Sequence, residues 1–455
     1  MLAGLPHRDH AADNVDLLLF IAYAMMGGII VGTVVTLLCQ HSRWPGSAYR
    51  VKTRRRRRQK SRPTKAEDVS HLSIRQGVLS MIVKYTKPGR NLIIVAMLIV
   101  LNGVTACASR PPSSVLQPVG LVQDENEKVT LLAITNREWE THGNGFGSRW
   151  ATKLTYEKYG FSIPSERKST AIVYPSKNLD LRRQFAVTAR KQLSESELID
   201  DATNAANFDG TVAVFVHGYN YSYQEALFRT AQIAADASAL SPPILFSWPS
   251  AASVTGYVTD RDAALYSRAE LERLLGALAR DSSVKRIVLF GHSMGGFLSM
   301  EAAVQLKLQG RRDVIGKLQI VLAAPDIDVD VFRSQLRDLG HMQAPITLLV
   351  SKTDRALTIS SVIGGERPRI GRLDIDDPTI RQAAIVHHVN IIDVTSAASS
   401  DGLGHDRYAA LARISGELRK AEAQNRGGGN VGALVFQAAG ASVAIPVNVT
   451  DRLAR

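Results

Sequence analysis

The chain has 455 residues, of which 45% are hydrophobic and 21% are charged, and its formal net charge is +13. This composition is ordinary for a globular protein and excludes collagen-like, coiled-coil and wholly disordered chains. The length predicts about three domain-sized pieces. Two cysteines in the whole sequence exclude a disulfide scaffold and a cysteine-rich metal site.

The positive charge is concentrated near the N-terminus. Residues 1–107 contain 16 Lys/Arg and 5 Asp/Glu, whereas the rest of the chain has a balance of only +2. A nucleic-acid-binding core would need a basic face of its own, so we expect no nucleic-acid partner.

The first apolar segment, residues 17–38, contains no charged residue and is long enough to span a bilayer. Asp16 precedes it and the run Arg54–Arg58 follows it, so the positive-inside bias places the basic loop in the cytoplasm. We therefore predict that residues 1–80 form a membrane anchor and a cytoplasmic loop. Alternatively, the start codon is set too far upstream, because Met81 opens a segment that reads as a complete signal by itself.

The second apolar stretch, residues 92–101, follows basic residues and is short for a membrane span. It is typical of the central region of a signal peptide. The sequence Val104-Thr105-Ala106-Cys107 resembles the lipobox of bacterial lipoproteins, which implies that Cys107 is acylated and that a flexible tether begins after it, over 108–119. Alternatively, residues 81–107 are an uncleaved second membrane helix. Either way, residues 108–455 lie across the membrane from the basic loop, in the periplasm or at the cell envelope.

Beyond a linker over 108–127, short β-branched runs alternate with amphipathic segments. This alternation predicts βαβ units and a mostly parallel central sheet with helices on both faces, in a catalytic domain over 128–425. Residues 136–210 have little periodicity and are expected to form an extension packed on the sheet edge, and a Gly-rich tail follows over 426–455. The predicted strands are 129–135, 211–216, 244–247, 286–290, 318–323, 346–350 and 389–393, and the predicted helices are 224–239, 261–281, 296–308 and 328–339.

The sharpest motif is Gly291-His292-Ser293-Met294-Gly295, between a predicted strand and a predicted helix. The pattern G-x-S-x-G places a serine on a tight strand-to-helix turn, where the residues two before and two after it must be small. The N–H groups of the helix that begins there point at the site and would stabilise an oxyanion. The same position would equally suit a helix N-cap, but the neighbouring motifs favour Ser293 as a nucleophile.

Partners for this serine follow other strands in the expected order. The strand 211–216 runs into His217-Gly218-Tyr219, where a second oxyanion donor belongs. We assign the two donors to the backbone N–H groups of Tyr219 and Met294. Asp354 follows the strand 346–350, and His405 follows the last strand after a polar loop. The order serine, aspartate, histidine is that of α/β hydrolases, with His405 as base and Asp354 orienting it.

Other residues compete for these roles. Asp326 also follows a strand and is an alternative acid, and the remaining candidates have blander explanations. Asp328 and Asp330 suit a helix start, His387 and His388 precede a strand at the wrong end of the sheet, His292 points away from the site, His341 lies in a connector, and His217 is expected to order its loop more than to act as a base.

Residues from about 128 to 410 resemble a family of bacterial α/β hydrolases with largely unassigned substrates, often described as esterase/lipase-like. The resemblance implies the three-layer hydrolase fold and a triad of Ser293, Asp354 and His405, and it says nothing of the N-terminal quarter. The motifs that support it are 215–220 (FVHGYN), 225–229 (EALFR), 246–250 (FSWPS), Tyr257 with 260–262 (DRD), the elbow at Ser293, 323–326 (AAPD), 354–357 (DRAL) and 404–405 (GH).

The sequence thus predicts a serine hydrolase that cleaves carboxylic esters through an acyl-enzyme on Ser293. His217, Trp248 and Tyr257 are predicted to line the substrate pocket, although Trp248 and Tyr257 would equally pack beneath the sheet edge. No cofactor or metal is expected. The absence of a long apolar insertion favours a small ester or an acylated envelope component over bulk triglyceride. An acyltransferase with the same triad, or a non-catalytic envelope protein on this fold, remains an alternative, and the oligomeric state is unreadable.

Overall fold

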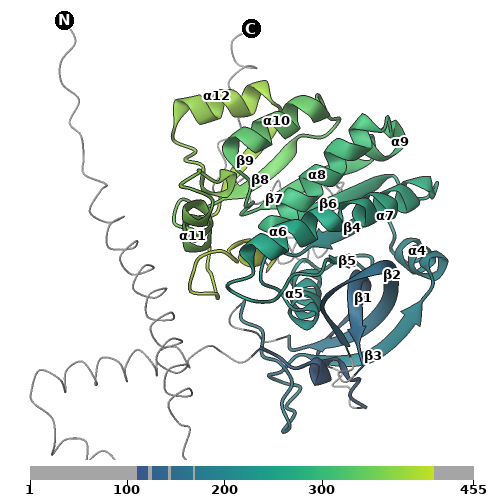
Figure 1. Cartoon of the computed structure of the whole chain (residues 1–455). Helices are drawn as coiled ribbons and strands as arrows, with labels where there is room; N and C mark the ends of the chain where they lie inside the picture. The colour runs from purple at the N-terminus through teal and green to yellow at the C-terminus, as the bar shows by residue number, and fades with distance from the viewer. Residues whose placement is uncertain (1–109, 121–124, 142–144, 166, 168–169, 414–455) are drawn as a thin grey trace, which may run out of the picture. The chain divides into compact units, whose positions relative to one another are not determined.

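The computed structural model describes residues 110–120, 125–141, 145–165, 167 and 170–413 (Figure 1). The two apolar segments 17–38 and 92–101, Cys107 and the tail 426–455 lie outside these residues, so their predicted roles stay predictions. Among the residues that are described, none of the helices combines the length and the apolar character that crossing a bilayer requires.

A sheet of nine strands runs through the described part of the chain in the order β3-β2-β1-β5-β4-β6-β7-β8-β9. The first three strands pair antiparallel, and every other neighbouring pair is parallel. The strands are β1 (Glu127–Glu140), β2 (Gly145–Ile163), β3 (Ala186–Leu193), β4 (Thr211–Val216), β5 (Ile244–Ser247), β6 (Arg286–His292), β7 (Leu318–Ala323), β8 (Ile346–Val350) and β9 (Val389–Asp393).

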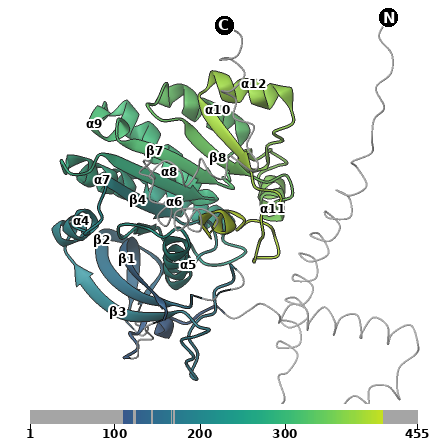
Figure 2. The same ribbon diagram turned by 180° about the vertical axis from the view of Figure 1, so that it is seen from behind.

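Helices cover both faces of this sheet. In Figure 1, α6, α7 and α8 lie side by side over one face, and Figure 2 shows the molecule from behind. The helices are α4 (Glu195–Thr203), α5 (Tyr223–Asp236), α6 (Tyr257–Tyr266), α7 (Arg268–Arg280), α8 (Met294–Leu308), α9 (Arg312–Ile315), α10 (Val329–Leu339), α11 (Arg355–Ile363) and α12 (Pro378–Val386), with 3-10 turns η1 (Ser113–Leu116) and η2 (Ile370–Arg372).

The alternation of side chains along β4 divides the interior into two cores. Val212, Val214 and Val216 face the core that contains the buried side of α7 and α8. Phe215 faces the other core, with the buried side of α5. Because successive residues of a strand point to opposite faces, a continuous run of apolar residues is what a strand with two covered faces requires. The mostly parallel sheet predicted from the sequence is confirmed.

The central strands match their predicted positions, and the helix predicted over 261–281 is corrected. It forms two helices that meet at Ser267. The backbone N–H of Ser267 bonds to the carbonyls of both Ala263 and Ala264, and its hydroxyl bonds to Ala263 O at 2.8 Å. A side chain that bonds back to the preceding turn competes with the regular helical ladder, and periodicity alone did not reveal this break.

The expected flexible tether over 108–119 is wrong for the residues described there. The η1 turn buries Val115 and Leu116 in the core that contains α5. The backbone N–H of Val119 bonds to the carbonyl of Val187 in β3 at 2.8 Å. This segment is therefore an integral part of the folded domain.

Candidate active site

Ser293 occupies the tight turn between β6 and α8. Its backbone has φ 53° and ψ −122°, in a region that non-glycine residues rarely adopt and that costs about 1–3 kcal/mol to hold. Ser293 N–H donates to Ala323 O at 2.9 Å, and its own carbonyl accepts from the N–H of Gly296. The neighbouring strand thus holds the strained turn in place, as the G-x-S-x-G pattern requires.

Three glycines allow the backbones around this turn to approach closely. A Cβ on Gly295 would lie 2.3 Å from the carbonyl oxygens of Val216 and His217, and one on Gly291 would lie 2.7 Å from the Cα of Gly296. A Cβ on Gly218 would lie 2.9 Å from the Cβ of Ser293. The loop after β4 therefore touches the serine turn. A side chain at Gly218 or Gly295 would push the two apart, and one at Gly291 would clash within the turn itself.

The structure brings Asp354 and His405 together. His405 Nδ1 lies 2.7 Å from Asp354 Oδ2, and the other carboxylate oxygen of Asp354 accepts the N–H of Leu357 at 2.9 Å. Asp354 is fully buried and caps the N-terminus of α11. With each oxygen engaged, the carboxylate is fixed in position and holds the imidazole by Nδ1, leaving Nε2 as the nitrogen available for proton transfer.

Two further carboxylates fasten the loop that holds His405. Asp401 Oδ1 accepts the N–H of Gly404 at 2.8 Å, and its Oδ2 accepts the N–H of His405 at 3.1 Å. Asp406 is nearly buried and pairs with Arg229 of α5 at 3.3 Å. These roles of Asp401, Asp406 and Arg229 were not predicted, although Arg229 and His405 both lie in the motifs that carry the family resemblance.

Burial and charge set the protonation of the histidines near Ser293. Burial lowers the pKa of His405, but the charge of Asp354 and its hydrogen bond outweigh this and raise the pKa above its usual value. Burial lowers the pKa of His292 well below its usual value, with the His405 charge adding to the effect. Burial and the neighbouring Arg137 lower the pKa of His217 to about 3. At neutral pH, His217 and His292 are therefore uncharged.

The loop predicted to supply an oxyanion donor is held by a buried carboxylate. Tyr219 follows Gly218, and its hydroxyl bonds to Ser253 O at 3.1 Å. The next residue, Asn220, has φ 63°, and its N–H donates to Asp260 Oδ2 at 3.0 Å. Asp260 is fully buried and also accepts from Ser250 Oγ at 2.6 Å and from Ala251 N–H at 2.5 Å. Asp260 thus ties the Tyr219 loop to the loop after β5.

A buried arginine of β1, Arg137, also joins the Tyr219 loop to the loop after β5. The Arg137 guanidinium donates to Tyr221 O at 2.9 Å, to Ser250 O at 3.1 Å and to Ser247 Oγ at 3.1 Å. Burial lowers its pKa to about 10, against the opposing charge of Asp260. Arg137 is therefore charged at neutral pH. Sequence reasoning missed this residue, because a single arginine in an exposed-looking stretch gives no local signal.

Asp326, the alternative acid, has other partners. Its Oδ1 accepts from Ser360 Oγ at 2.7 Å and lies 3.2 Å from Arg369 Nε, while its Oδ2 accepts from Tyr257 OH at 2.8 Å. Its backbone N–H bonds to Ser293 O at 3.2 Å. Asp326 therefore braces the serine turn and α6, whereas the contact with His405 belongs to Asp354.

The predicted substrate-pocket residues need a correction. His217 and Trp248 are both fully buried, with their rings stacked at 4.9 Å, and Trp248 Nε1 donates to His217 O at 2.8 Å. Neither side chain is accessible to a ligand. Both instead pack between the loop after β4 and the loop after β5 and support them. Tyr257 retains a small exposure and packs edge-on against Tyr219 at 5.5 Å.

The other competing residues, apart from His292, lie where the sequence placed them. Asp328 is the N-cap of α10, and Asp330 lies in its first turn. His387 and His388 precede β9, at the sheet edge opposite Ser293, and the ring of His388 stacks on that of His341 at 4.8 Å. The prediction that His292 points away from the site is wrong. Its ring lies 4.7 Å from that of His405, and its Nε2 lies 3.3 Å from His405 O. It therefore supports the His405 loop.

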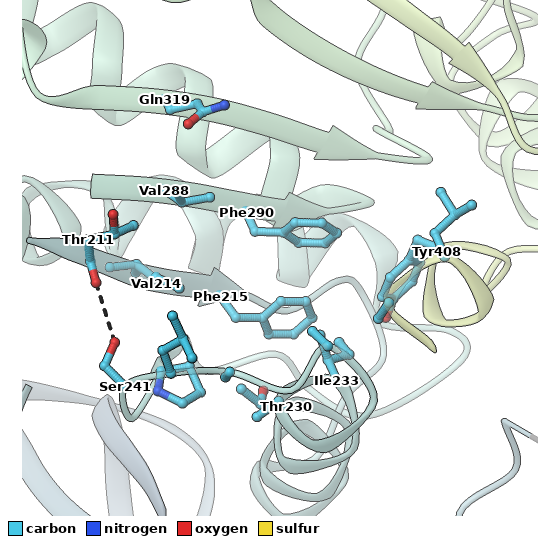
Figure 3. Close-up of a pocket in the computed structure, with 18 of the residues that line it drawn as sticks. Thr211, Val214, Phe215, Thr230, Ile233, Ser241, Val288, Phe290, Gln319 and Tyr408 are labelled. Atoms are coloured by element: carbon cyan, nitrogen blue, oxygen red, sulfur yellow. Dashed lines mark hydrogen bonds between the residues drawn. The ribbon is translucent and has the colours of Figure 1, made fainter. Parts of the chain in front are cut away.

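A cavity of about 190 Å³ lies away from Ser293, on the sheet face under α5 (Figure 3). Phe215 and Phe290 from the strands and Ile233 from α5 line it, and Tyr408 stands at one end. Ser241 Oγ bonds to Thr211 O at 3.4 Å at the other end. Its walls are mainly apolar and contain neither Ser293 nor His405.

Among the described residues, no group of three or more His, Cys, Asp or Glu side chains would hold a metal ion.

Comparison with protein families assigns the chain to a family of hydrolases. A family model described as alpha/beta hydrolase of unknown function (DUF900) matches residues 192–422. No curated protein matches the sequence significantly. Among solved structures, a putative hydrolase of the alpha/beta superfamily from Xanthomonas campestris is 16% identical, with 47% of this chain and 98% of that chain covered and a TM-score of 0.26. Esterase B from Lactobacillus rhamnosis is 11% identical, with 78% and 99% covered and a TM-score of 0.32. With scores this low, neither structure bears on the site.

Proposed function

The chain belongs to the family of alpha/beta hydrolases of unknown function, and we propose that it is a serine esterase. In this proposal Ser293 is the nucleophile, His405 the base and Asp354 the residue that orients the base. The observation that supports it most is the 2.7 Å contact between His405 Nδ1 and Asp354 Oδ2. Ser293 lies on a strained turn, and the residue before it, His292, contacts the His405 ring. We further propose, from the sequence, that the domain lies on the outer side of the cytoplasmic membrane.

The first half of the reaction forms an acyl-enzyme. Ser293 Oγ attacks the ester carbonyl carbon while His405 Nε2 takes the hydroxyl proton. The carbonyl oxygen becomes an oxyanion, which the backbone N–H groups of Tyr219 and Met294 stabilise. Met294 is the first residue of α8, so its N–H has no acceptor within the helix. The intermediate then collapses, the C–O bond to the alcohol breaks, and His405 gives its proton to the leaving alcohol.

The second half releases the acid. His405 Nε2 removes a proton from a water molecule, whose oxygen attacks the acyl carbon. The same two N–H groups hold the second oxyanion. When it collapses, the bond to Ser293 Oγ breaks, and His405 returns its proton to the serine. The products are one carboxylic acid and one alcohol, and the enzyme regains its starting state.

Hydrolysis of 4-nitrophenyl acetate by the full chain tests this assignment. We expect Ser293→Ala and His405→Ala to lower kcat/KM by about 10³-fold or more, because triad members act as a unit. Asp354→Asn is expected to cost about 10²–10⁴-fold. The matched control is Asp326→Asn, which changes the alternative acid. If Asp326→Asn lowered kcat/KM more than Asp354→Asn does, the assignment of the acid would be wrong.

A further inference from the structure

The segment that follows Cys107 is bound to the loop beside the proposed nucleophile. Arg110 Nη1 donates to Asn220 O at 3.1 Å, and its Nη2 donates to Asn220 Oδ1 at 2.5 Å. The same guanidinium pairs with the Glu225 carboxylate, and Gln224 Nε2 donates to Pro111 O at 2.7 Å. Arg110 thus fastens the start of the described chain to the residue immediately after Tyr219.

Covalent reach limits how far the preceding segment extends from this point. Arg110 is three positions after Cys107 and nine positions after Leu101, where the apolar stretch ends. At about 3.6 Å per extended residue, these lengths correspond to at most about 11 Å and about 32 Å. A lipid on Cys107, or a membrane segment that ends at Leu101, would therefore hold the Asn220 loop close to the bilayer surface.

Exposed aliphatic side chains gather at the same edge of the domain. Val254 is 74% exposed and Val258 is 68% exposed. Val254 O accepts the Tyr219 hydroxyl, and Val258 follows Tyr257, which bonds to Asp326. Both valines therefore flank the loops around Ser293.

A second group of exposed aliphatic side chains comes from the other side of the site. Ile359 and Ile363 lie one turn apart on α11, and Leu403 lies two residues before His405; all three are more than 40% exposed. Ile359 neighbours Ser360, whose hydroxyl bonds to Asp326, and Leu403 O accepts the N–H of Arg355. We define the apolar rim as Val254, Val258, Ile359, Ile363 and Leu403.

We propose that the apolar rim contacts a lipid bilayer and that the substrate is an ester presented at that surface. This inference rests on the proposed function. Arg110 fixes the orientation, because it binds the chain emerging from the apolar stretch 92–101 to the same loop that the rim flanks. Exposed aliphatic side chains in water cost free energy that contact with lipid would recover. A lipid-borne ester would reach Ser293 without leaving the surface.

Photo-crosslinking of the full chain tests the contact without depending on hydrolysis. The Ser293→Ala variant is reconstituted in phosphatidylcholine vesicles that contain a diazirine-acyl phosphatidylcholine, and adducts are mapped by mass spectrometry. We expect adducts on peptides that contain residues 254–258 and 359–363, in addition to residues 1–109. The internal control is Leu308 and Val386, which are 65% and 66% exposed. Leu308 ends α8, about 21 Å along the helix from Met294. Adducts confined to residues 1–109, or equally frequent at Leu308 and Val386, would overturn the inference.

Rates on two substrates test the substrate class. We compare hydrolysis of a fluorogenic lipid ester in phosphatidylcholine vesicles with hydrolysis of soluble 4-nitrophenyl acetate. The double variant Val254→Ser/Val258→Ser should lower the ratio of the vesicle rate to the soluble rate about tenfold, whereas Leu308→Ser/Val386→Ser should leave the ratio unchanged. Equal ratios in both variants would contradict the inference. Crosslinking at the rim without any ester hydrolysis would instead overturn the proposed function and leave the lipid contact standing.

Discussion

Replacing Asp260 by asparagine isolates the role of the buried carboxylate that joins the two loops. Its Oδ2 accepts the N–H of Asn220, and its Oδ1 accepts the N–H of Ala251. An amide of the same shape has only one oxygen, so one of these N–H groups would face an NH₂ group and lose its acceptor. Each buried polar group left unsatisfied costs about 1–3 kcal/mol. With the N–H and the facing amide both unsatisfied, we expect a loss of about 2–6 kcal/mol.

Thermal unfolding of the full chain measures this loss. A change of 1 kcal/mol shifts Tm by roughly 2–4 °C in a domain of this size, so Asp260→Asn should lower Tm by about 4–24 °C. The matched control is Asp262→Asn, two residues away on α6 and exposed, which should shift Tm by less than about 2 °C. Equal shifts in the two variants would refute the reasoning, because the buried carboxylate would then have no special part in joining the loops.

Three further changes follow from the site geometry. The Cβ that Gly295→Ala adds would lie 2.3 Å from two carbonyl oxygens at the end of β4. We expect this clash to displace the oxyanion donors and to lower kcat/KM for soluble esters at least about 10²-fold, which is the cost of losing one such donor. Wild-type rates would contradict this expectation. The acid limb of kcat/KM against pH should have its midpoint above about 6.5, because His405 has a raised pKa and must be neutral to act as a base. Asp354→Asn should move that midpoint to lower pH, and an unmoved midpoint would assign the limb to another group. Arg229→Gln, which removes the ion pair to Asp406, should lower kcat about tenfold with KM nearly unchanged, and a purely structural role would lower Tm alone.

The strands of the parallel sheet were readable from the sequence because burial on both faces demands continuous apolar runs. β4, β5, β7, β8 and β9 have the predicted bounds. β2 and β3 alternate charged and apolar residues over long stretches with little contrast. The sequence therefore predicted only an extension packed on the sheet edge there, whereas these segments are strands of the sheet itself. Local hydrogen bonds also interrupt helices where the hydrophobic periodicity continues. The helix predicted over 261–281, for example, is interrupted at Ser267.

The candidate site, like the fold, was predicted only in part. Chain order and position after a strand were enough to single out Ser293, Asp354 and His405, because the carboxyl ends of parallel strands meet at one edge of the sheet. The sequence left Asp326 open as an alternative to Asp354, because the contacts that distinguish them come from residues distant in sequence. His405 contacts Asp354, whereas Arg369 and Tyr257 contact Asp326. Arg110 was missed for the same reason, since its partner Asn220 lies 110 residues further along the chain.

Labelling of the full chain with a fluorophosphonate probe, followed by peptide mapping, tests the central claim most directly. The probe forms a covalent bond only with a serine that a neighbouring base activates. The account predicts an adduct on Ser293 that disappears in Ser293→Ala and falls strongly in His405→Ala. A folded protein with no adduct on Ser293 would contradict the account and favour a non-catalytic role for this fold.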